Sequence, residues 1–304
     1  MLLGIGITSK TFSASEKMKS HLDCIPCFIK QSLEAARMAT DDKKVHEQVL
    51  KEVMKHLQSI SFENSPPELS REVHAIIRRL TASEDPYKEA KEESNKMGQR
   101  LYGNLKRHVE TSDDSLLMAT KLAIVGNVID FGTMNRFNVD EMVNQALRED
   151  FDGSSYPRFK EVLQESKTIL YIADNSGEIF FDKLLLEELK KLGKEITYVV
   201  KANPIINDVL LEDAKVAGID KLANIIAGDD GQNESTPGAV LHYASDKFLD
   251  LFEKSDMIIS KGQGNYEGLS DVSREVFFML VVKCHLVARD IKTEVGKLVL
   301  KVNT

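Results

Sequence analysis

The chain of 304 residues contains no tryptophan and only three cysteines, and no apolar run approaches the length that crosses a membrane. A membrane-spanning helix needs about 20 consecutive apolar residues, so we expect no membrane partner. Acidic residues outnumber basic ones, which gives a formal net charge of −8. Because a basic surface is what binds a phosphate backbone, this charge argues against nucleic acid as the main partner.

The cysteines argue against a disulfide scaffold. Three is an odd number, and two of the three lie in the spacing Cys24-x-x-Cys27. The first residues have a short apolar start without a preceding basic residue or a clear cleavage site, so secretion is not expected. Met18 offers an alternative start, and we expect residues 1–17 to be a disordered extension. A reducing, cytoplasmic setting is predicted.

Three familiar sequence motifs are missing. The chain has no G-x-x-x-x-G-K-[ST] loop, and no G-x-G-x-x-G follows its first predicted strand. A G-x-S-x-G elbow is absent too. These absences argue against the common nucleotide-cradling loops and against a serine hydrolase.

The pattern of apolar residues changes near Pro157. Before it the spacing is helical, with helix-start signals such as the segment 63–68. After it, short strand-like runs alternate with helices. We predict an α/β protein with an all-helical domain over residues 18–156. An α/β domain over residues 157–304 follows, built on a parallel sheet with helices on both faces.

Polar side chains follow the predicted strands at the points where they end. Asp174 and Asn175 come after the first strand, Asp208 after the second, and Lys261 after the last. In an open parallel sheet ligands bind at the carboxyl ends of the strands, so these residues should share one cleft. Carboxylate and amide oxygens suit Mg²⁺ or Mn²⁺, and we predict that Asp174, Asn175 and Asp208 hold such a cation.

A phosphate site is predicted beside the cation. Ser176 and Gly177 open a helix, and their backbone N–H groups could receive a phosphate at its positive end. Lys261 would place an ammonium at the same rim. The alternative is that Asp174 and Asn175 only cap the helix and that the Lys-Gly pair is a turn.

Two polar positions interrupt an apolar helical segment over 123–132. Asn127 and Asp130 are three residues apart and therefore lie on one helix face. They face either the cleft or a polar network that joins the two domains. The segment 85–95, which carries Lys88, Lys91 and Asn95, is instead interpreted as a solvated helix face.

The cysteines suggest a second site. Cys24 and Cys27 can share one face of a helix start, whereas Cys284 can approach them only through the fold. Together with His21 or His285, three thiolates could bind zinc or another thiophilic metal. Inert buried thiols and a redox dithiol are the alternatives.

Five segments, taken in order, resemble the motifs of the damage-control phosphatase family. They are DPYKEAKEESN, GNVIDFG, DNSGE, NPIINDV and SKGQGNYEGL. The Cys24-x-x-Cys27 motif and the Lys283-Cys284 pair resemble the signature of its prokaryotic branch. The resemblance extends from about His21 nearly to the C-terminus, and it implies a helical domain on a Rossmann-like domain.

The resemblance also implies an activity: hydrolysis of phosphomonoesters of small metabolites, such as sugar phosphates or damaged phosphometabolites, with Mg²⁺, Mn²⁺, Co²⁺ or Ni²⁺. By motif, Asp174, Asn175 and Asp208 match the metal ligands, and Lys261 matches the phosphate-binding lysine. Asn127 and Asp130 match the residues that face the cleft. Gln263 stands where eukaryotic relatives commonly have an acid, so their substrate preferences do not transfer.

The expected roles follow. Asp174 and Lys261 are predicted to be catalytic, Glu178 or Asp130 to act as acid or base, and Asn265 to contact substrate. The nucleophile is a water activated by the cation or Asp174 itself, which would give an aspartyl-phosphate. Two other classes stay open: an S-adenosylmethionine-dependent carboxyl methyltransferase, and a metal-binding protein without catalysis.

Overall fold

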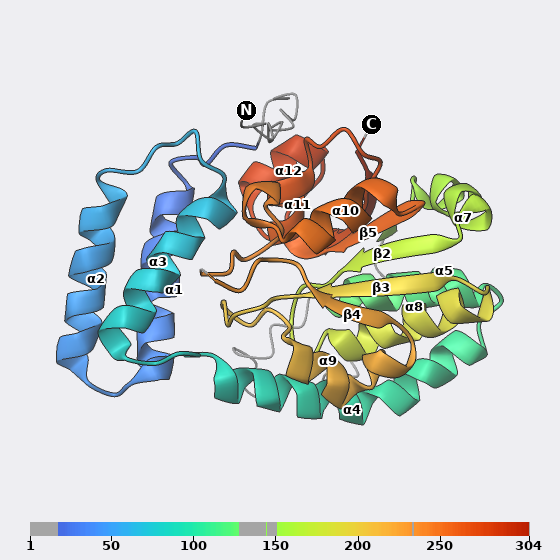
Figure 1. The fold of residues 1–304 in the computed structure, drawn as a ribbon, viewed down its shortest axis with the longest axis horizontal. Coiled ribbons are helices and arrows are strands. Elements are labelled where there is room, and N and C mark those ends of the chain that lie inside the picture. The colour runs from blue at the N-terminus through green and yellow to red at the C-terminus, as the bar shows by residue number, and fades with distance from the viewer. Residues whose placement is uncertain (1–17, 128–143, 145–150, 233, 304) are drawn as a thin grey trace, which may run out of the picture.

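A twisted sheet forms the centre of the computed structural model, which describes all residues except 1–17, 128–143, 145–150, 233 and 304 (Figure 1). Its seven described strands lie in the order β1-β7-β6-β5-β2-β3-β4. Every neighbouring pair is parallel except β6 and β7. The strands are β1 Phe151–Asp152, β2 Thr168–Ile172, β3 Glu195–Val200, β4 Asn224–Ala227, β5 Met257–Lys261, β6 Phe277–Val281 and β7 Leu298–Val302.

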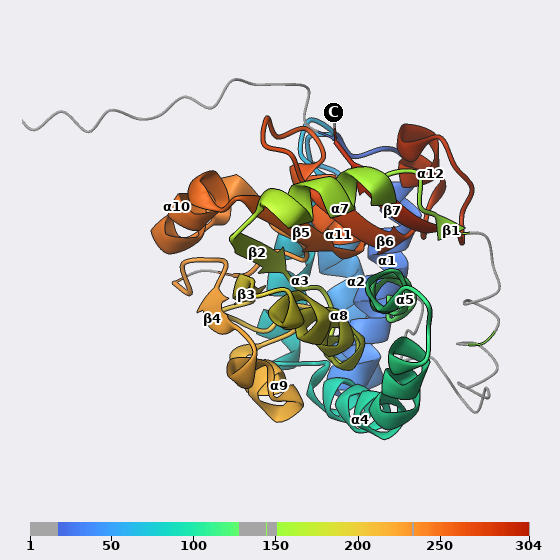
Figure 2. The same ribbon diagram turned by 90° about the vertical axis from the view of Figure 1, so that its right-hand side faces the viewer.

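Helices cover both faces of this sheet, as the alternating pattern predicts (Figures 1 and 2). Ile169 and Tyr171 of β2 join one core with α8, while Leu170 and Ile172 join a second core with α10 to α12. Both sides of the strand are therefore buried, which explains its unbroken apolar sequence. The helices are α1 Cys24–Ala39, α2 Lys43–Leu57, α3 Pro66–Thr81, α4 Lys88–Glu110, α5 Ser115–Val125, α7 Tyr156–Glu165, α8 Ile179–Lys191, α9 Leu211–Ala217, α10 Asp246–Lys254, α11 Gly262–Leu269 and α12 His285–Ile291, with the 3-10 turns η1 Ile219–Lys221 and η2 Leu241–Tyr243.

The first three helices form a separate unit at the carboxyl end of the strands (Figure 1). They enclose their own core, in which Phe28 of α1, Val49 of α2 and Ile77 of α3 are buried. A capping box of Ser65 and Glu68, with proline in the first turn, fixes the start of α3. This unit supplies one wall of the cavity described below.

The helical unit ends earlier than the predicted boundary at residue 156. Leu105 of α4 and Leu122 of α5 are buried in the same core as α8 and the sheet, so these helices belong to the α/β layer. The sequence gives helical periodicity but not the surface on which a helix packs. The apolar composition of α5, whose residues from Leu122 to Val125 are all buried, is typical of a helix covered on all sides.

The strand β6 lies inside the sheet rather than at its edge. All five residues of β6 are buried, and the strand lies between β5 and β7. A continuous apolar run is typical of an interior strand rather than an edge. The edge is completed by β1, whose two residues are too few to give a recognisable pattern.

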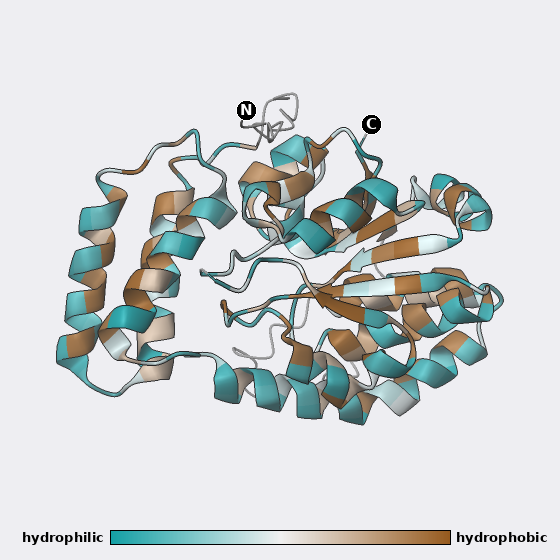
Figure 3. Ribbon diagram, viewed as in Figure 1, coloured by the Kyte–Doolittle hydropathy of each residue, from teal (hydrophilic) through white to brown (hydrophobic). Residues whose placement is uncertain are grey.

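Hydrophilic residues mark the outward sides of the helices, and hydrophobic residues are concentrated in the strands and the inward helix faces (Figure 3). Within the described ranges, no helix combines the length and the apolar composition needed to cross a bilayer.

The buried His74 of α3 makes the fold sensitive to acid. Burial, followed by the charge of Arg78, lowers the pKa of His74 to about 4, and its Nε2 atom has no hydrogen-bond partner among the described residues. Because folding lowers the pKa of His74, the stability that depends on its neutral form is fully present above about pH 6.5. This contribution is lost as the pH falls towards 4. The loss amounts to about 3 kcal/mol.

We therefore expect His74→Gln to flatten the fall in unfolding free energy between pH 7 and pH 4, measured by urea denaturation. The exposed His242 supplies a matched control, since His242→Gln should leave the slope unchanged. A slope equal to that of the parent chain in His74→Gln would contradict this account.

Candidate functional site

Two strand ends are held side by side, and this brings the predicted metal ligands together. The backbone N–H of Val209 donates to the carbonyl of Asp174 (2.9 Å), and that of Ser176 donates to the carbonyl of Asn207 (2.9 Å). Asn175 and Asp208 form an isolated antiparallel bridge between the same segments. The loops after β2 and β3 therefore place Asp174, Asn175 and Asp208 in one cluster, as the sequence predicts.

The two carboxylates of this cluster are almost fully buried. Asp174 is 8 % exposed and Asp208 is 4 % exposed. Burial, and then the charges of Glu178 and Asp208, raises the pKa of Asp174 to about 8. Burial likewise raises the pKa of Asp208 to about 6, although the charge of Lys201 acts in the opposite direction. Both acids are difficult to ionise at the same time, because their charges would be buried and would repel each other. A bound cation would offset this cost.

Amide groups orient one of these acids. The Nδ2 atoms of Asn127 and Asn175 each donate to Asp174 Oδ2 at 2.6 Å. Asn127 Nδ2 also lies 3.0 Å from Glu178 Oε2. Asn127 thus meets the cluster, as expected, whereas Asp130 lies outside the described residues. The position of the Asp174 carboxylate is consequently fixed before any ligand arrives.

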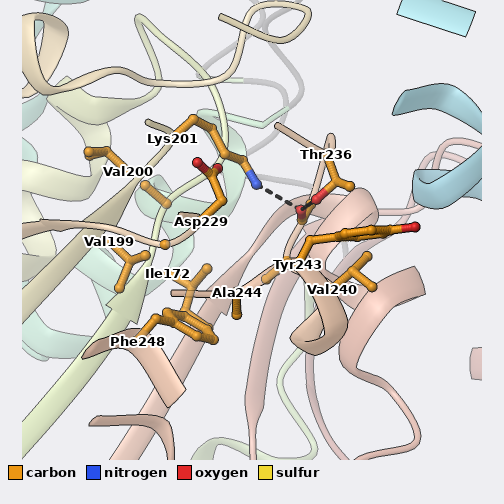
Figure 4. A pocket seen from close by; sticks show the side chains of 14 residues that line it. Ile172, Val199, Val200, Lys201, Asp229, Thr236, Val240, Tyr243, Ala244 and Phe248 are labelled. Atoms are coloured by element: carbon orange, nitrogen blue, oxygen red, sulfur yellow. Dashed lines mark hydrogen bonds between the residues drawn. The ribbon is translucent and has the colours of Figure 1, made fainter. Parts of the chain in front are cut away.

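Asp208 keeps one oxygen without a hydrogen bond in the described part of the chain. Its Oδ2 atom is buried, and Lys201 Nζ lies 3.6 Å from it. Lys201 instead donates to the carbonyl of Gly238 (2.7 Å), beside a small cavity of about 20 Å³ (Figure 4). A buried carboxylate oxygen without a donor fits a hard cation, and the oxygen donors present are those that Mg²⁺ and Mn²⁺ prefer. As the side chains stand, no described group of three or more His, Cys, Asp and Glu residues surrounds one point.

A cavity of about 520 Å³ opens over this cluster. The helical unit forms one wall with residues of α1 and α3, and the segments after β5 and β6 form the other. The lining includes Asn127, Asp174, Asn175, Asp208, Cys24, Cys27, Phe28, Ser70, Gln263, Glu267, Lys283, Cys284 and His285. The site is therefore shared between the helical unit and the α/β layer.

Lys261 lies elsewhere than the sequence predicts. Its side chain is 0 % exposed and does not line the cavity. Its ammonium pairs with Glu178 and with Asp182, the latter at 2.6 Å. Burial opposes its charge, but the carboxylates of Asp182 and Glu178 outweigh burial and raise the pKa of Lys261. Glu178, expected as acid or base, is 1 % exposed and belongs to the same network rather than to the lining.

The hydroxyls of Tyr171 and Tyr198 complete this network. They donate to the two oxygens of Asp182 at 2.7 and 2.8 Å. Each buried charge is thus paired and hydrogen-bonded, which is the condition under which buried ions are tolerated. The sequence contains only a weak signal for it: Glu178 and Asp182 stand four residues apart at the start of α8, but this helix carries several further charged residues.

The backbone groups expected to bind phosphate are already occupied. The N–H of Ser176 donates to Asn207, and the N–H of Gly177 donates to Asn95 Oδ1 at 2.8 Å. Neither residue lines the cavity. Asn265, expected to contact substrate, is also fully buried and bonds to the carbonyls of Ala173 and Lys261. These three residues do not line the cavity, and their hydrogen bonds hold the backbone around it in place.

The helix over 88–110 is another difference from the prediction. Asn95 is 6 % exposed, and its Nδ2 donates to Asp213 at 2.7 Å while its oxygen accepts from Gly177. Lys91 is 3 % exposed and pairs with Asp85 at 2.6 Å. The abundance of charged residues in this helix suggested a solvated face, but two of the polar residues face inward.

Sequence reasoning missed the lysine that does line the cavity. Lys283 follows β6, is exposed, and lowers the pKa of Asp174 through its charge. No ion pair joins it to any of the described residues. Its position two residues beyond the end of β6 is the available signal, which the Lys-Cys motif alone does not reveal.

Gly262 gives the site a tight constraint that can be tested. Its φ is +79°, and a Cβ atom at this position would overlap the carboxylate of Asp174. We expect Gly262→Ala to displace Asp174 and to weaken Mn²⁺ binding at least about tenfold, measured by calorimetry. Gly103→Ala is the control, because a Cβ there meets nothing within 4 Å and alanine favours the helix. Unchanged Mn²⁺ affinity in Gly262→Ala would contradict the placement of Asp174.

Known proteins are similar to this chain over most of its length. A family model described as the damage-control phosphatase ARMT1-like domain matches residues 20–299. A damage-control phosphatase of Archaeoglobus fulgidus is 33% identical over 285 residues, which cover 92% of this chain and 97% of that protein. One from Pyrococcus horikoshii is 32% identical over 286 residues, with 93% and 97% coverage. An uncharacterised protein of Methanocaldococcus jannaschii is 35% identical over 295 residues, with 94% and 96% coverage.

A solved structure agrees with the fold. The crystal structure of a DUF89 family protein from Pyrococcus horikoshii matches with a TM-score of 0.86 and 32% identity, covering 94% of this chain and 100% of that one. The family match and these relatives identify the chain as a metal-dependent phosphatase. The chain belongs to the damage-control phosphatase ARMT1-like family.

Proposed function

We propose that the cavity binds a small phosphorylated metabolite and that Asp174, Asn175 and Asp208 hold a divalent cation beside it. The observation that carries this proposal is the buried pair of acids, one with an oxygen that lacks a donor, in the same cavity as the exposed Lys283. A cation bound there would neutralise the charge that develops on the phosphoryl oxygens.

The residues of the chain have distinct tasks in this proposal. Lys283 binds phosphate oxygens, because its ammonium lines the cavity without an ion pair in the described structure. Asn127 holds the Asp174 carboxylate in place. Lys261 and Glu178 act indirectly, by fixing the helix that follows the Asp174 loop. Positioning and electrostatics of this kind supply most of the catalysis in phosphoryl transfer.

Water is the proposed nucleophile. Its oxygen attacks phosphorus, the ester P–O bond breaks, and a proton reaches the leaving oxygen, which gives an alcohol and inorganic phosphate. Asp174 is the less suitable nucleophile, because its Oδ2 atom already accepts hydrogen bonds from two amides.

The cavity sets the size of the substrate. A volume of about 520 Å³ suits a small molecule, and a phosphorylated sugar is the substrate class that we propose. Mg²⁺, Mn²⁺, Co²⁺ and Ni²⁺ are the candidate cations. We also assign the enzyme to the cytoplasm, a choice supported by its three free thiols.

Phosphate release tests this function. Protein stripped with a chelator is supplied with Mg²⁺, Mn²⁺, Co²⁺ or Ni²⁺ and assayed with p-nitrophenyl phosphate and a panel of sugar phosphates. We expect turnover only after a metal is restored. Absence of release with every metal would refute the proposal. Binding of S-adenosylmethionine under those conditions would then favour methyl transfer, and no binding would favour a protein without catalysis.

A further inference from the structure

The backbone that carries the cavity lysine leaves the sheet directly after β6. The pairing of β6 with β7 ends at Val281 and Leu298. The N–H of Val282 still donates to the carbonyl of Lys297 (3.1 Å). Lys283 comes next, and its N–H donates to a side chain instead. Because a backbone donor that leaves a sheet needs a new partner, that side chain fixes the first residue beyond the strand.

The side chain is that of Gln263, in the first turn of α11. Its Oε1 atom accepts from the Lys283 N–H at 2.8 Å. Its Nε2 atom donates to Glu267 Oε1 at 2.8 Å and lies 3.4 Å from Cys284 Sγ. All four residues line the large cavity. One amide therefore joins the segment after β5 to the segment after β6 at the cavity wall.

Glu267 determines which way this amide is turned. An amide oxygen only accepts hydrogen bonds, and an amide nitrogen only donates them. Glu267 stands one helical turn after Gln263, is 9 % exposed and accepts from the nitrogen. The oxygen is thereby left for the N–H of Lys283. The opposite orientation would set two donors against each other on one side and two acceptors on the other.

A carboxylate could not replace the amide at position 263. It would keep an oxygen for the N–H of Lys283, but it would have no hydrogen to donate to Glu267. Two carboxylates in contact would also repel each other. The arrangement thus depends on the combination of an amide at Gln263 and an acid at Glu267.

We propose that Gln263, oriented by Glu267, is a positioning residue that fixes the backbone of Lys283 and so keeps its ammonium at the phosphate position in the cavity. This inference rests on the proposed function, in which Lys283 binds phosphate oxygens. A lysine ammonium is carried on a flexible four-carbon stem, so the anchored backbone limits the space that the ammonium can reach. Gln263 itself touches neither phosphate nor cation in this proposal.

The affinity for inorganic phosphate, measured by calorimetry at saturating Mn²⁺, tests the role of the amide. We expect Gln263→Ala to weaken phosphate binding about tenfold, the order of one lost hydrogen bond with its orienting effect. Mn²⁺ affinity should stay unchanged, because the amide bonds to Glu267 and the segment after β6 rather than to the cation ligands. Gln99→Ala, at an exposed position of α4, is the matched control.

A double-variant cycle shows whether Gln263 acts through the lysine. In the Lys283→Met background, Gln263→Ala should weaken phosphate binding no further, because the ammonium that it positions is already absent. A merely structural role would give losses that add. Full additivity, or unchanged phosphate affinity in Gln263→Ala alone, would overturn the proposal.

A rescue experiment tests the hydrogen-bond pattern itself. Gln263→Glu should weaken phosphate binding at least as much as Gln263→Ala. Adding Glu267→Gln restores one donor and one acceptor between the same two positions, so this double variant should recover most of the lost affinity. Absence of any recovery, in a variant that circular dichroism shows to be folded, would contradict the role assigned to Glu267.

Amide hydrogen exchange separates failure of this inference from failure of the proposed function. Exchange at Lys283 should be faster in Gln263→Ala and should slow again in the rescued double variant, with or without phosphate. Unchanged exchange in Gln263→Ala would refute the anchor. Failure of the proposed function would instead appear in the parent chain, as absence of phosphate binding and release with every metal.

Discussion

Asp174→Asn is expected to lower kcat/KM for phosphate release about 10³-fold while leaving the chelated protein at least as stable as the parent chain. Activity should fall because a charged ligand of the cation is lost. Stability should not fall, because the raised pKa of Asp174 means that its charge disfavours the fold. An amide also keeps the oxygen that accepts from Asn127 and Asn175. Kinetics with saturating Mn²⁺ and thermal melting with chelator measure the two effects.

The exposed Asp220 provides a matched control, since Asp220→Asn should change neither quantity. An Asp174→Asn rate within about tenfold of the parent rate, equal to about 1.4 kcal/mol of barrier, would remove Asp174 from the catalytic site. A large drop in melting temperature would instead indicate that this acid is structural.

Two lysine variants should separate binding from folding. Lys283→Met is expected to reduce kcat/KM about 10²-fold or more with little change in unfolding free energy, because this exposed ammonium lines the cavity. Lys261→Met is expected to cost about 3–5 kcal/mol of stability, because it leaves Glu178 and Asp182 as buried charges without their cation. Steady-state kinetics and urea denaturation distinguish the variants.

The reverse pattern would refute this assignment. If Lys261→Met unfolds like the parent chain but loses activity, its ammonium reaches the substrate, as the family motif implies. If Lys283→Met retains full activity, phosphate is bound by other groups.

The sequence indicates which residues meet at the strand ends better than it indicates which of them face the cavity. Asp174, Asn175 and Asp208 follow strand ends, and parallel topology alone brings such positions together. Whether a residue at a strand end faces the cavity or the interior depends on packing that no local pattern encodes. Lys261 illustrates this point, because its partner Asp182 is one of several charged residues of α8, and no local pattern marks it as the buried one.

The packing of α4 and α5 shows a second limit of prediction from sequence. Periodicity identifies α4 and α5 as helices, but their packing on α8 depends on contacts between distant parts of the chain. Likewise, no pattern around Asn95 indicates that its oxygen accepts from Gly177, more than eighty positions later. The burial of a polar residue in a helix can therefore be predicted only if its hydrogen-bond partner is already known.

The most direct test of the account is the position of a bound ion. A crystal of the full chain grown with Mn²⁺ and inorganic phosphate, measured at the manganese absorption edge, locates the ion by its anomalous scattering. We expect a peak coordinated by Asp174 and Asp208, with a phosphate oxygen beside it and Lys283 on the opposite side of the phosphate. A fully occupied peak away from both carboxylates, with phosphate bound elsewhere, would contradict the account.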